Sequence, residues 1–331
     1  MIKTRLLLLS LSLFLLFNSC KHIESFFEKY HDGFDILIEY IESEKDYING
    51  REVPFFIFAP EVYGNSDKYL IIDIRTSEDF KNGHIENSVN VQFPDLINYI
   101  ENIINPLDYE KIVFVCNNGF HSGFATMGLM YLGYKNIYPL RNGLSSWNKQ
   151  IADKYWFKGI SSVLSDKLEN TEKEKNEPAD YPVLLTTKET GQEILRERII
   201  EIFNGNINDY FVEITDIKDS TESYYIISYW DQSRYFRGHI PTSIHYIPKQ
   251  SLKTGTYLST LPTDKPVVIQ CFTGDHAAFV TMFLRILGYD ARDLMYGSNS
   301  FMYNILEATE RPGGYFTDRM IFNFPLIKEG N

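Results

Sequence analysis

A cysteine at the end of an apolar run carries the clearest chemistry in this sequence. Cys116 closes the run that begins at Lys111, and a short segment through Gly119 joins it to a helix-like stretch from Ser122 to Tyr134. In open α/β sheets, ligands bind beyond the carboxyl ends of the strands, close to loop N–H groups and helix N-termini. These N–H groups and helix N-termini favour a thiolate and a bound anion, so the pattern predicts a nucleophilic thiol of lowered pKa.

The same pattern occurs twice along the chain. Residues 71–85 align with 226–240, and residues 116–134 align with 271–289, both at an offset of 155. Ten of the 19 positions in the second pair are identical. One register held over about sixty residues indicates a tandem duplication of a domain-sized unit. Cys271 is therefore a second candidate nucleophile.

The elements that must position these cysteines alternate between strands and helices. Short apolar runs predict buried parallel strands, and longer stretches with helical spacing predict helices between them. The expected strands are 69–74, 88–93, 111–116 and 137–140, and the expected helices are 34–47, 122–134 and 190–203. Residues 161–180 are polar and charged and predict an exposed linker, and we expect the last twenty residues to pack on the second copy.

Several motifs together resemble the rhodanese family of sulfurtransferases. The residues that carry the resemblance are Asp73-x-Arg75, Phe80, Gly83-His84-Ile85, Asn87-Ser88-Val89-Asn90-Val91, Cys116-x-x-Gly119-x-His121-Ser122, and Leu140-x-Asn142-Gly143 with Trp147. The resemblance implies an α/β fold with two tandem rhodanese-like domains, each a parallel sheet flanked by helices. We place an N-terminal linker and helix at 20–50, the first domain at 51–160, an acidic linker at 161–189 and the second domain at 190–331.

The resemblance implies a sulfurtransferase without metal or cofactor. Cys116 would take the sulfane sulfur of a donor such as thiosulfate as a persulfide and pass it to a thiol or to cyanide. The loop residues expected to bind the substrate are Asn117, Asn118, Gly119, Phe120, His121 and Ser122, and His121 could be positively charged near neutral pH. The alternative is a non-catalytic rhodanese-like module that binds a partner protein at the cell envelope.

The second copy keeps the cysteine but changes its surroundings. Ser228 and Trp230 replace the Asp-x-Arg pair, and Ala277 replaces Ser122. Asp275 adds a carboxylate to the loop, which should raise the pKa of the Cys271 thiol and repel an anionic donor. These changes favour Cys116 over Cys271 as the catalytic residue.

Other polar residues have simpler structural interpretations. We expect Asp73 and Arg75 to form a structural ion pair, with a role in shaping the site as the alternative. His84 and His239 are expected to make structural hydrogen bonds in the Gly-His-Ile turns. Arg141 is expected on the exposed surface, and guidance of anions into the pocket is the alternative.

The first residues read as a targeting segment. Lys3 and Arg5 precede an apolar run from 6 to 17, which is short for a membrane span. Ser19-Cys20 resembles the lipobox of bacterial lipoproteins, which implies a signal peptide at 1–19, lipidation of Cys20 and an extracytoplasmic protein anchored to a membrane of the cell envelope. A plain secretory signal and an uncleaved transmembrane anchor are the alternatives. The net charge of −12 argues against a nucleic-acid partner.

Overall fold

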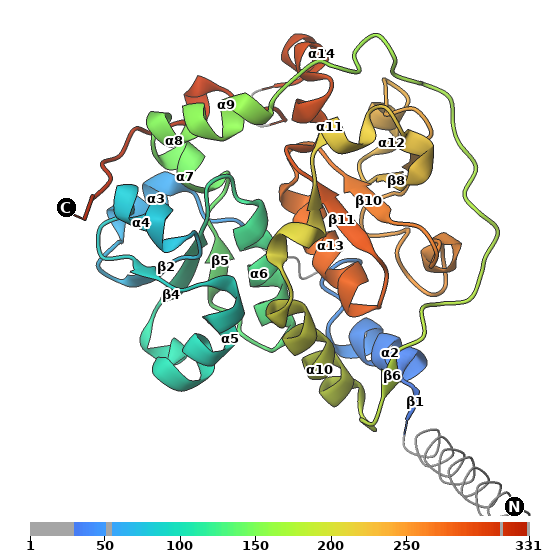
Figure 1. Cartoon of the computed structure of the whole chain (residues 1–331), viewed down its shortest axis with the longest axis horizontal. Coiled ribbons are helices and arrows are strands. Elements are labelled where there is room, and N and C mark those ends of the chain that lie inside the picture. Colours follow the sequence, from blue (N-terminus) through green and yellow to red (C-terminus); the bar gives the residue numbers. More distant parts are fainter. Residues whose placement is uncertain (1–29, 51–54, 312–313, 330–331) are drawn as a thin grey trace, which may run out of the picture.

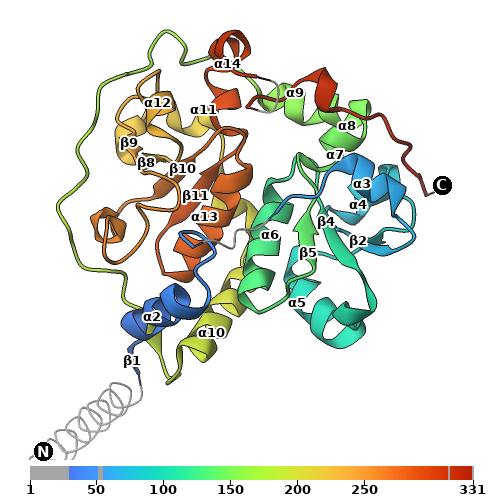
Figure 2. The ribbon, with the colours of Figure 1, turned by 180° about the vertical axis from the view of Figure 1, so that it is seen from behind.

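The computed structural model describes residues 30–50, 55–311 and 314–329, and it contains two α/β units side by side (Figures 1 and 2). The first unit is built on a four-stranded sheet in the order β3-β2-β4-β5, with all neighbouring strands parallel. Its strands are β2 (Tyr69–Asp73), β3 (Val89–Asn90), β4 (Lys111–Val115) and β5 (Ile137–Pro139).

The second unit repeats this sheet with one more strand. Its order is β7-β11-β10-β8-β9, again parallel throughout. The strands are β7 (Phe211–Val212), β8 (Tyr225–Ser228), β9 (Ile244–His245), β10 (Val267–Gln270) and β11 (Ala291–Leu294). In the first unit the additional strand is reduced to one parallel bridge between Ile57 and Leu140.

Helices precede, connect and follow the strands in both units. The helices of the first half are α2 (Phe34–Glu44), α3 (Ala59–Gly64), α4 (Ser77–Asn82), α5 (Leu96–Asn98), α6 (Phe120–Tyr131), α7 (Gly143–Trp147), α8 (Lys149–Lys154) and α9 (Trp156–Gly159). Those of the second half are α10 (Gly191–Asn204), α11 (Ile214–Ile217), α12 (Gln232–Tyr235), α13 (Asp275–Ile286) and α14 (Tyr303–Thr309). The predicted α/β fold with two tandem units is confirmed, as are the three predicted helices, within a few residues at their ends.

The helices that follow the two cysteines form the centre of the molecule. α6 and α13 pack against each other, and almost all their residues are buried. Small residues allow this close approach, since a Cβ atom added to Gly123 would lie 3.5 Å from the Cβ of Ala278. One hydrophobic cluster therefore runs through both units. This explains why both helices are apolar on nearly every face.

The end of the chain follows our prediction only in part. We expected the last twenty residues to pack on the second unit. Tyr315 does so against Tyr303, and the N–H of Phe316 donates to Asn299, but residues 322–327 lie against the first unit. Phe324 stacks on Tyr63 at 4.1 Å between ring centroids, and the indole N–H of Trp147 donates to the carbonyl of Pro325. Ile327 forms an antiparallel bridge with His84. Aromatic surface on the first unit, which local sequence does not reveal, takes up the apolar tail.

The segment between the units makes the reciprocal contact. Residues 161–189 run along the outside of the second unit (Figure 1), and Glu169 bridges to His239, the counterpart of His84. Gly238 faces Leu168 as Gly83 faces Leu326. Much of the linker is exposed, as predicted, but Leu164 is buried. The segment that trails each unit thus crosses onto the other unit.

The segments that lead into the two units are exchanged as well. β1 (His31–Asp32) pairs antiparallel with β6 (Leu185–Thr186), and α2 packs against α10. α2 and the turn after it bond to the second unit, through Glu42 to Thr254 and through Asn49 to the carbonyl of Leu252. α10 reaches the first unit, where Phe203 stacks on Phe93.

The predicted targeting segment and Cys20 lie outside the described residues. Within the described ranges, no helix has both the length and the apolar character to cross a membrane.

Candidate functional site

The loop between β4 and α6 wraps around the Cys116 thiol. The backbone N–H of Gly119 points to the sulfur at 3.1 Å, and the N–H of Ser122 points to it at 3.4 Å. The hydroxyl of Ser122 lies 3.3 Å from the same atom. Gly119 has a φ of +99°, which an L side chain rarely adopts, and this conformation turns the loop back over the sulfur. The arrangement presents donors to a negative charge on sulfur.

The pKa of Cys116 corrects our prediction. We expected the loop and the helix N-terminus to lower it, but burial raises it above its usual value, although hydrogen bonds from Ser122 and from the backbone of Asn118 and Gly119 oppose the rise. The side chain is buried to 2% exposure. Since removal from water disfavours the thiolate more than these few donors favour it, the free protein holds a neutral thiol near pH 7.

A cavity of about 400 Å³ opens beside Cys116, and both units line it. The first unit contributes a mostly polar wall, and the second unit contributes the loop after α10. The lining residues are Ile74, Arg75, Thr76, Asp79, Gln92, Phe93, Pro94, Cys116, Asn117 and His121 from the first unit, and Gly205, Asn206, Ile207 and Asn208 from the second.

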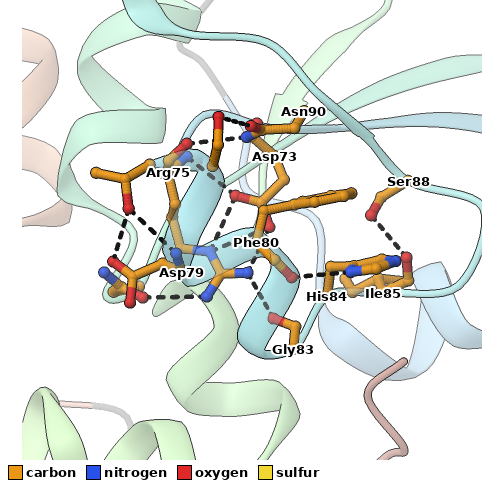
Figure 3. Close-up of polar contacts among 12 residues, drawn as sticks. Asp73, Arg75, Asp79, Phe80, Gly83, His84, Ile85, Ser88 and Asn90 are labelled. Carbon is orange, nitrogen blue, oxygen red and sulfur yellow. Dashed lines mark hydrogen bonds and ion pairs between the residues drawn. The ribbon is translucent and has the colours of Figure 1, made fainter. Parts of the chain in front are cut away.

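Asp73 and Arg75 form a buried ion pair at one side of this cavity, as we expected. The distance from Nη2 of Arg75 to Oδ2 of Asp73 is 2.7 Å, and the same nitrogen donates to the carbonyl of Gly83 (Figure 3). Nη1 lies 3.5 Å from the side-chain oxygen of Asn117 in the cysteine loop. The pair therefore has a structural role, and it also places a guanidinium in the wall of the cavity.

The two turn histidines are structural, as predicted. Nδ1 of His84 lies 2.9 Å from the carbonyl of Phe80, and Nδ1 of His239 lies 2.8 Å from the carbonyl of Tyr235. Each imidazole also stacks on the aromatic ring of the same residue, Phe80 for His84 and Tyr235 for His239. Arg141 is half-buried, with its guanidinium 5.4 Å from the ring centre of Phe58.

The remaining loop residues divide between the cavity and the contact between the units. Asn117 and His121 line the cavity, whereas the ring of Phe120 is fully buried against Trp156 and Tyr296. The carbonyl of Asn118 accepts from the indole N–H of Trp156. Phe120, which we expected to bind substrate, lies outside the cavity lining because its side chain fills the interface.

The charge of His121 also differs from our prediction. Its ring lies edge-on to Phe211 of the second unit, 4.5 Å between ring centres. Burial lowers its pKa to about 4, so the imidazole is neutral at pH 7 rather than positively charged. It can still donate or accept one hydrogen bond at the cavity wall.

The Cys271 loop has the same backbone shape in a different electrostatic setting. The N–H of Gly274, at φ +91°, points to Sγ at 3.2 Å. Burial raises the pKa of Cys271 to about 12, and the buried carboxyls of Asp293 and Asp275 add to the rise. The effect of Asp275 is as predicted, and Asp293 contributes more. The two cysteines do not form a disulfide.

Phe120 and Asp275 occupy equivalent positions and reach across to the opposite loop. A Cβ atom on Gly274 would lie 2.9 Å from the ring of Phe120, and a Cβ atom on Gly119 would lie 3.0 Å from Oδ1 of Asp275. The two cysteine loops are therefore in direct contact.

Sequence reasoning missed the residues that complete the Cys116 cavity from elsewhere in the chain. Gln92 lies within a predicted strand, and Asn206 and Asn208 follow a predicted helix, but no local pattern placed them near Cys116. Asp293 was also missed. The sequence carries no clear signal for it, because its strand, Ala291–Leu294, also contains Arg292 and is not an apolar run.

Comparison with known proteins matches both units to one family. The model of the rhodanese-like domain matches residues 59–150 and 201–303. Thiosulfate sulfurtransferase GlpE of Shewanella oneidensis is 32% identical over 80 residues, which cover 24% of this chain and 75% of that protein. A rhodanese-related protein from Thermoplasma volcanium has a solved structure that is 26% identical, with a TM-score of 0.25, and the match covers 30% of this chain and 92% of that one.

Longer relatives have other activities. The tRNA uridine(34) hydroxylase of Buchnera aphidicola is 25% identical over 146 residues, which cover 42% of this chain. The chain spans 44% of the length of that relative.

Proposed function

Because this chain belongs to the rhodanese-like domain family, with matches over more than half of its length, we propose that it is a sulfurtransferase that carries sulfur on Cys116. The observation that carries the proposal is the pair of N–H groups, from Gly119 and Ser122, that point at Sγ beside an open polar cavity. Such donors stabilise charge on the sulfur and on a sulfur bound to it.

The proposed reaction has two steps. The Cys116 thiolate attacks the outer sulfur of thiosulfate, the sulfur–sulfur bond of the donor breaks, and sulfite leaves with its electron pair. Cyanide or an acceptor thiolate then attacks the outer sulfur of the persulfide, and the Cys116 thiolate is restored. The guanidinium of Arg75 in the cavity wall would offset the negative charge of the donor.

The raised pKa of Cys116 sets the pH dependence. Since burial favours the neutral thiol, loading with sulfur and alkylation by iodoacetamide should both accelerate as the pH rises above neutrality. Cys271 should require a higher pH than Cys116, because carboxyls add to the effect of burial there.

The second candidate function is the non-catalytic protein-binding module. Burial of both thiols, with raised pKa values, is the observation that favours it. A module of this kind would take up no sulfur at any pH at which the protein stays folded.

Mass spectrometry of the intact chain distinguishes the sulfurtransferase from the binding module. The protein is incubated with thiosulfate and then with cyanide, beside Cys116→Ser and Cys271→Ser. We expect a gain of one sulfur atom that cyanide removes, present in Cys271→Ser and absent in Cys116→Ser. If the sulfur gain were lost only in Cys271→Ser, the activity would belong to the second unit. No gain with thiosulfate, mercaptopyruvate or a polysulfide would favour the binding module.

We also propose that the protein is anchored to the bacterial cell envelope through lipid on Cys20. The support is the charged and apolar leader that ends in Ser19-Cys20. Metabolic labelling with an alkyne-bearing palmitate should mark the wild-type chain and not Cys20→Ser. Equal labelling of both would reject the anchor.

A further inference from the structure

One cavity of the second unit is lined by three arginines. Its volume is about 500 Å³, and its walls come from α12 and the turn after it, from the second cysteine loop and from the segment after α14. Arg234, Arg237 and Arg311 line it, together with Glu310 and Phe272. We call it the arginine cavity.

The arginine cavity is distinct from the cavity beside Cys271. The Cys271 cavity has a volume of about 430 Å³, and Tyr47 and Ile48, from the turn after α2, are in its wall. Phe272 lines both cavities, so they adjoin at the second cysteine loop. The three arginines line only the arginine cavity, which therefore needs an explanation of its own.

The arginine cavity is positively charged although the protein is acidic. The chain has a net charge of −12, yet three guanidinium groups lie in this one wall. Two carboxylates oppose them, Glu310 in the wall and Asp231, which pairs with Arg234. These five groups leave a net charge of +1, and a cleft of one sign attracts ligands of the opposite sign.

Comparison of the two units shows that the fold does not require three arginines here. Arg234 of α12 stands at the position of Asp79 of α4, at the offset of 155. Asp79 holds its helix through one ion pair, with Lys154 at 3.1 Å. Arg234 makes a comparable pair of reversed charge with Glu310, at 3.2 Å. Since one pair is enough in the first unit, the structural need does not account for the other two arginines.

Those two arginines keep donors available for a ligand. Arg237 bonds to Glu310 through Nη1, and a guanidinium carries five N–H groups, so most of its donors stay available. The side chain of Arg311 makes no hydrogen bond or ion pair with another described residue. Arg234 is held more firmly, because its guanidinium also lies 4.4 Å from the ring centre of Phe272.

Two arginines from separate segments suit an anion with several oxygen atoms. Arg237 follows α12 and Arg311 follows α14, and a guanidinium binds an oxyanion through paired hydrogen bonds. A tetrahedral oxyanion has enough oxygen atoms for two such groups, whereas a carboxylate has only two oxygens. We propose that the arginine cavity binds a phosphate-like oxyanion, either free or as part of a larger molecule, through Arg237 and Arg311. This binding does not depend on sulfur transfer at Cys116, so the two proposals can fail separately.

Isothermal titration calorimetry of the full chain tests this site. The probes are inorganic phosphate, phenyl phosphate and benzoate, at about pH 8, where a phosphate monoester carries close to two negative charges, and at constant ionic strength set with sodium chloride. We expect saturable binding of one phosphate or phenyl phosphate per chain, and binding of benzoate that is weaker by about tenfold. Tighter binding of phenyl phosphate than of phosphate would indicate a larger organic ligand, and equal binding a free anion.

Two variants with opposite expected effects assign the contact. Arg311→Gln should weaken phosphate binding by about tenfold, and it breaks no contact with a described residue, so the fold should persist. Arg319→Gln, an exposed arginine outside the lining, is its control. Glu310→Gln keeps an acceptor for the arginines but removes the competing charge, and should tighten binding several-fold. Glu307→Gln, on α14 but outside the lining, should leave the affinity within about twofold.

Several results would overturn the proposal. Absence of saturable phosphate binding would reject the site, and binding of benzoate as tight as that of phenyl phosphate would reject the ligand class. The same affinity in Arg311→Gln as in Arg319→Gln would show that phosphate binds elsewhere. Affinity in Glu310→Gln that is no tighter than in Glu307→Gln would also remove the assignment to this cavity.

Discussion

The buried carboxyl of Asp275 should make the stability of the protein depend on pH. Burial raises its pKa from 3.8 to about 6, although Arg141 and the Thr273 hydroxyl oppose the rise. Oδ1 has no hydrogen-bond partner among the described residues, and Oδ2 accepts from Thr273 at 2.9 Å. The folded protein therefore binds this proton more tightly than the unfolded chain does.

The sign and size of this pH dependence follow from the thermodynamic linkage between proton binding and folding. Because the folded-state pKa is raised, the stability that the proton contributes is fully present below pH 3.8 and is lost as the pH rises through about 6. A shift of about two units corresponds to about 3 kcal/mol. At about pH 7.5 the ionised carboxylate destabilises the fold by this amount.

Asp275→Asn removes the titration while leaving an acceptor for Thr273. We expect the variant to be more stable than the wild type by up to about 3 kcal/mol at pH 7.5, and the difference to disappear near pH 4. Urea unfolding at several pH values, followed by circular dichroism, measures it. Asp219→Asn is the surface control, because Lys218 lowers the pKa of Asp219 and its change should be small and of opposite sign. A stability difference for Asp275→Asn that is independent of pH would refute the reasoning.

Three further variants probe the contacts that hold the site. Arg75→Gln leaves Asp73 buried without its cation, and urea unfolding should show a loss of about 3–5 kcal/mol. Gly143→Ala should destabilise the protein by more than about 1 kcal/mol in the same assay, since its φ is +56° and the added Cβ would lie 2.3 Å from the carbonyl oxygen of Cys116. Gly64→Ala is its control and should be close to neutral, because nothing lies within 4 Å of the added atom. A chain ending at 321 loses the Pro325 and Ile327 contacts, so hydrogen exchange should quicken at residues 83–85 and stay unchanged at 238–240.

The sheets and the central helices could be predicted because their patterns are local. Runs such as 69–74 and 111–116 are apolar enough to be buried strands in any arrangement, and the offset of 155 carried the same assignment to the second unit. The Asp73–Arg75 pair was predictable for the same reason, since two residues on one short segment must stay close together.

The destination of the connecting segments could not be predicted. An amphipathic helix such as α10 shows which face is buried but not which unit buries it. The register of the repeat also slips by one residue before the last strand, because Tyr296 and Gly297 take the left-handed positions of Asn142 and Gly143 at an offset of 154. The pKa of Cys116 depends on the balance between burial and hydrogen bonds from a few N–H groups, and the local sequence does not determine this balance.

Because the two units exchange segments, each cavity is complete only when both units are present. The loop after α10, which belongs to the second half of the sequence, closes the Cys116 cavity, and the turn after α2, which belongs to the first half, closes the Cys271 cavity. The trailing segments cross over in the same way, at Glu169 and Ile327. Separation of the two units would therefore remove part of the wall from both sites. This reciprocity gives a reason to retain the second copy that is independent of the nucleophilicity of Cys271, and it leaves the second cavity able to diverge toward a different ligand.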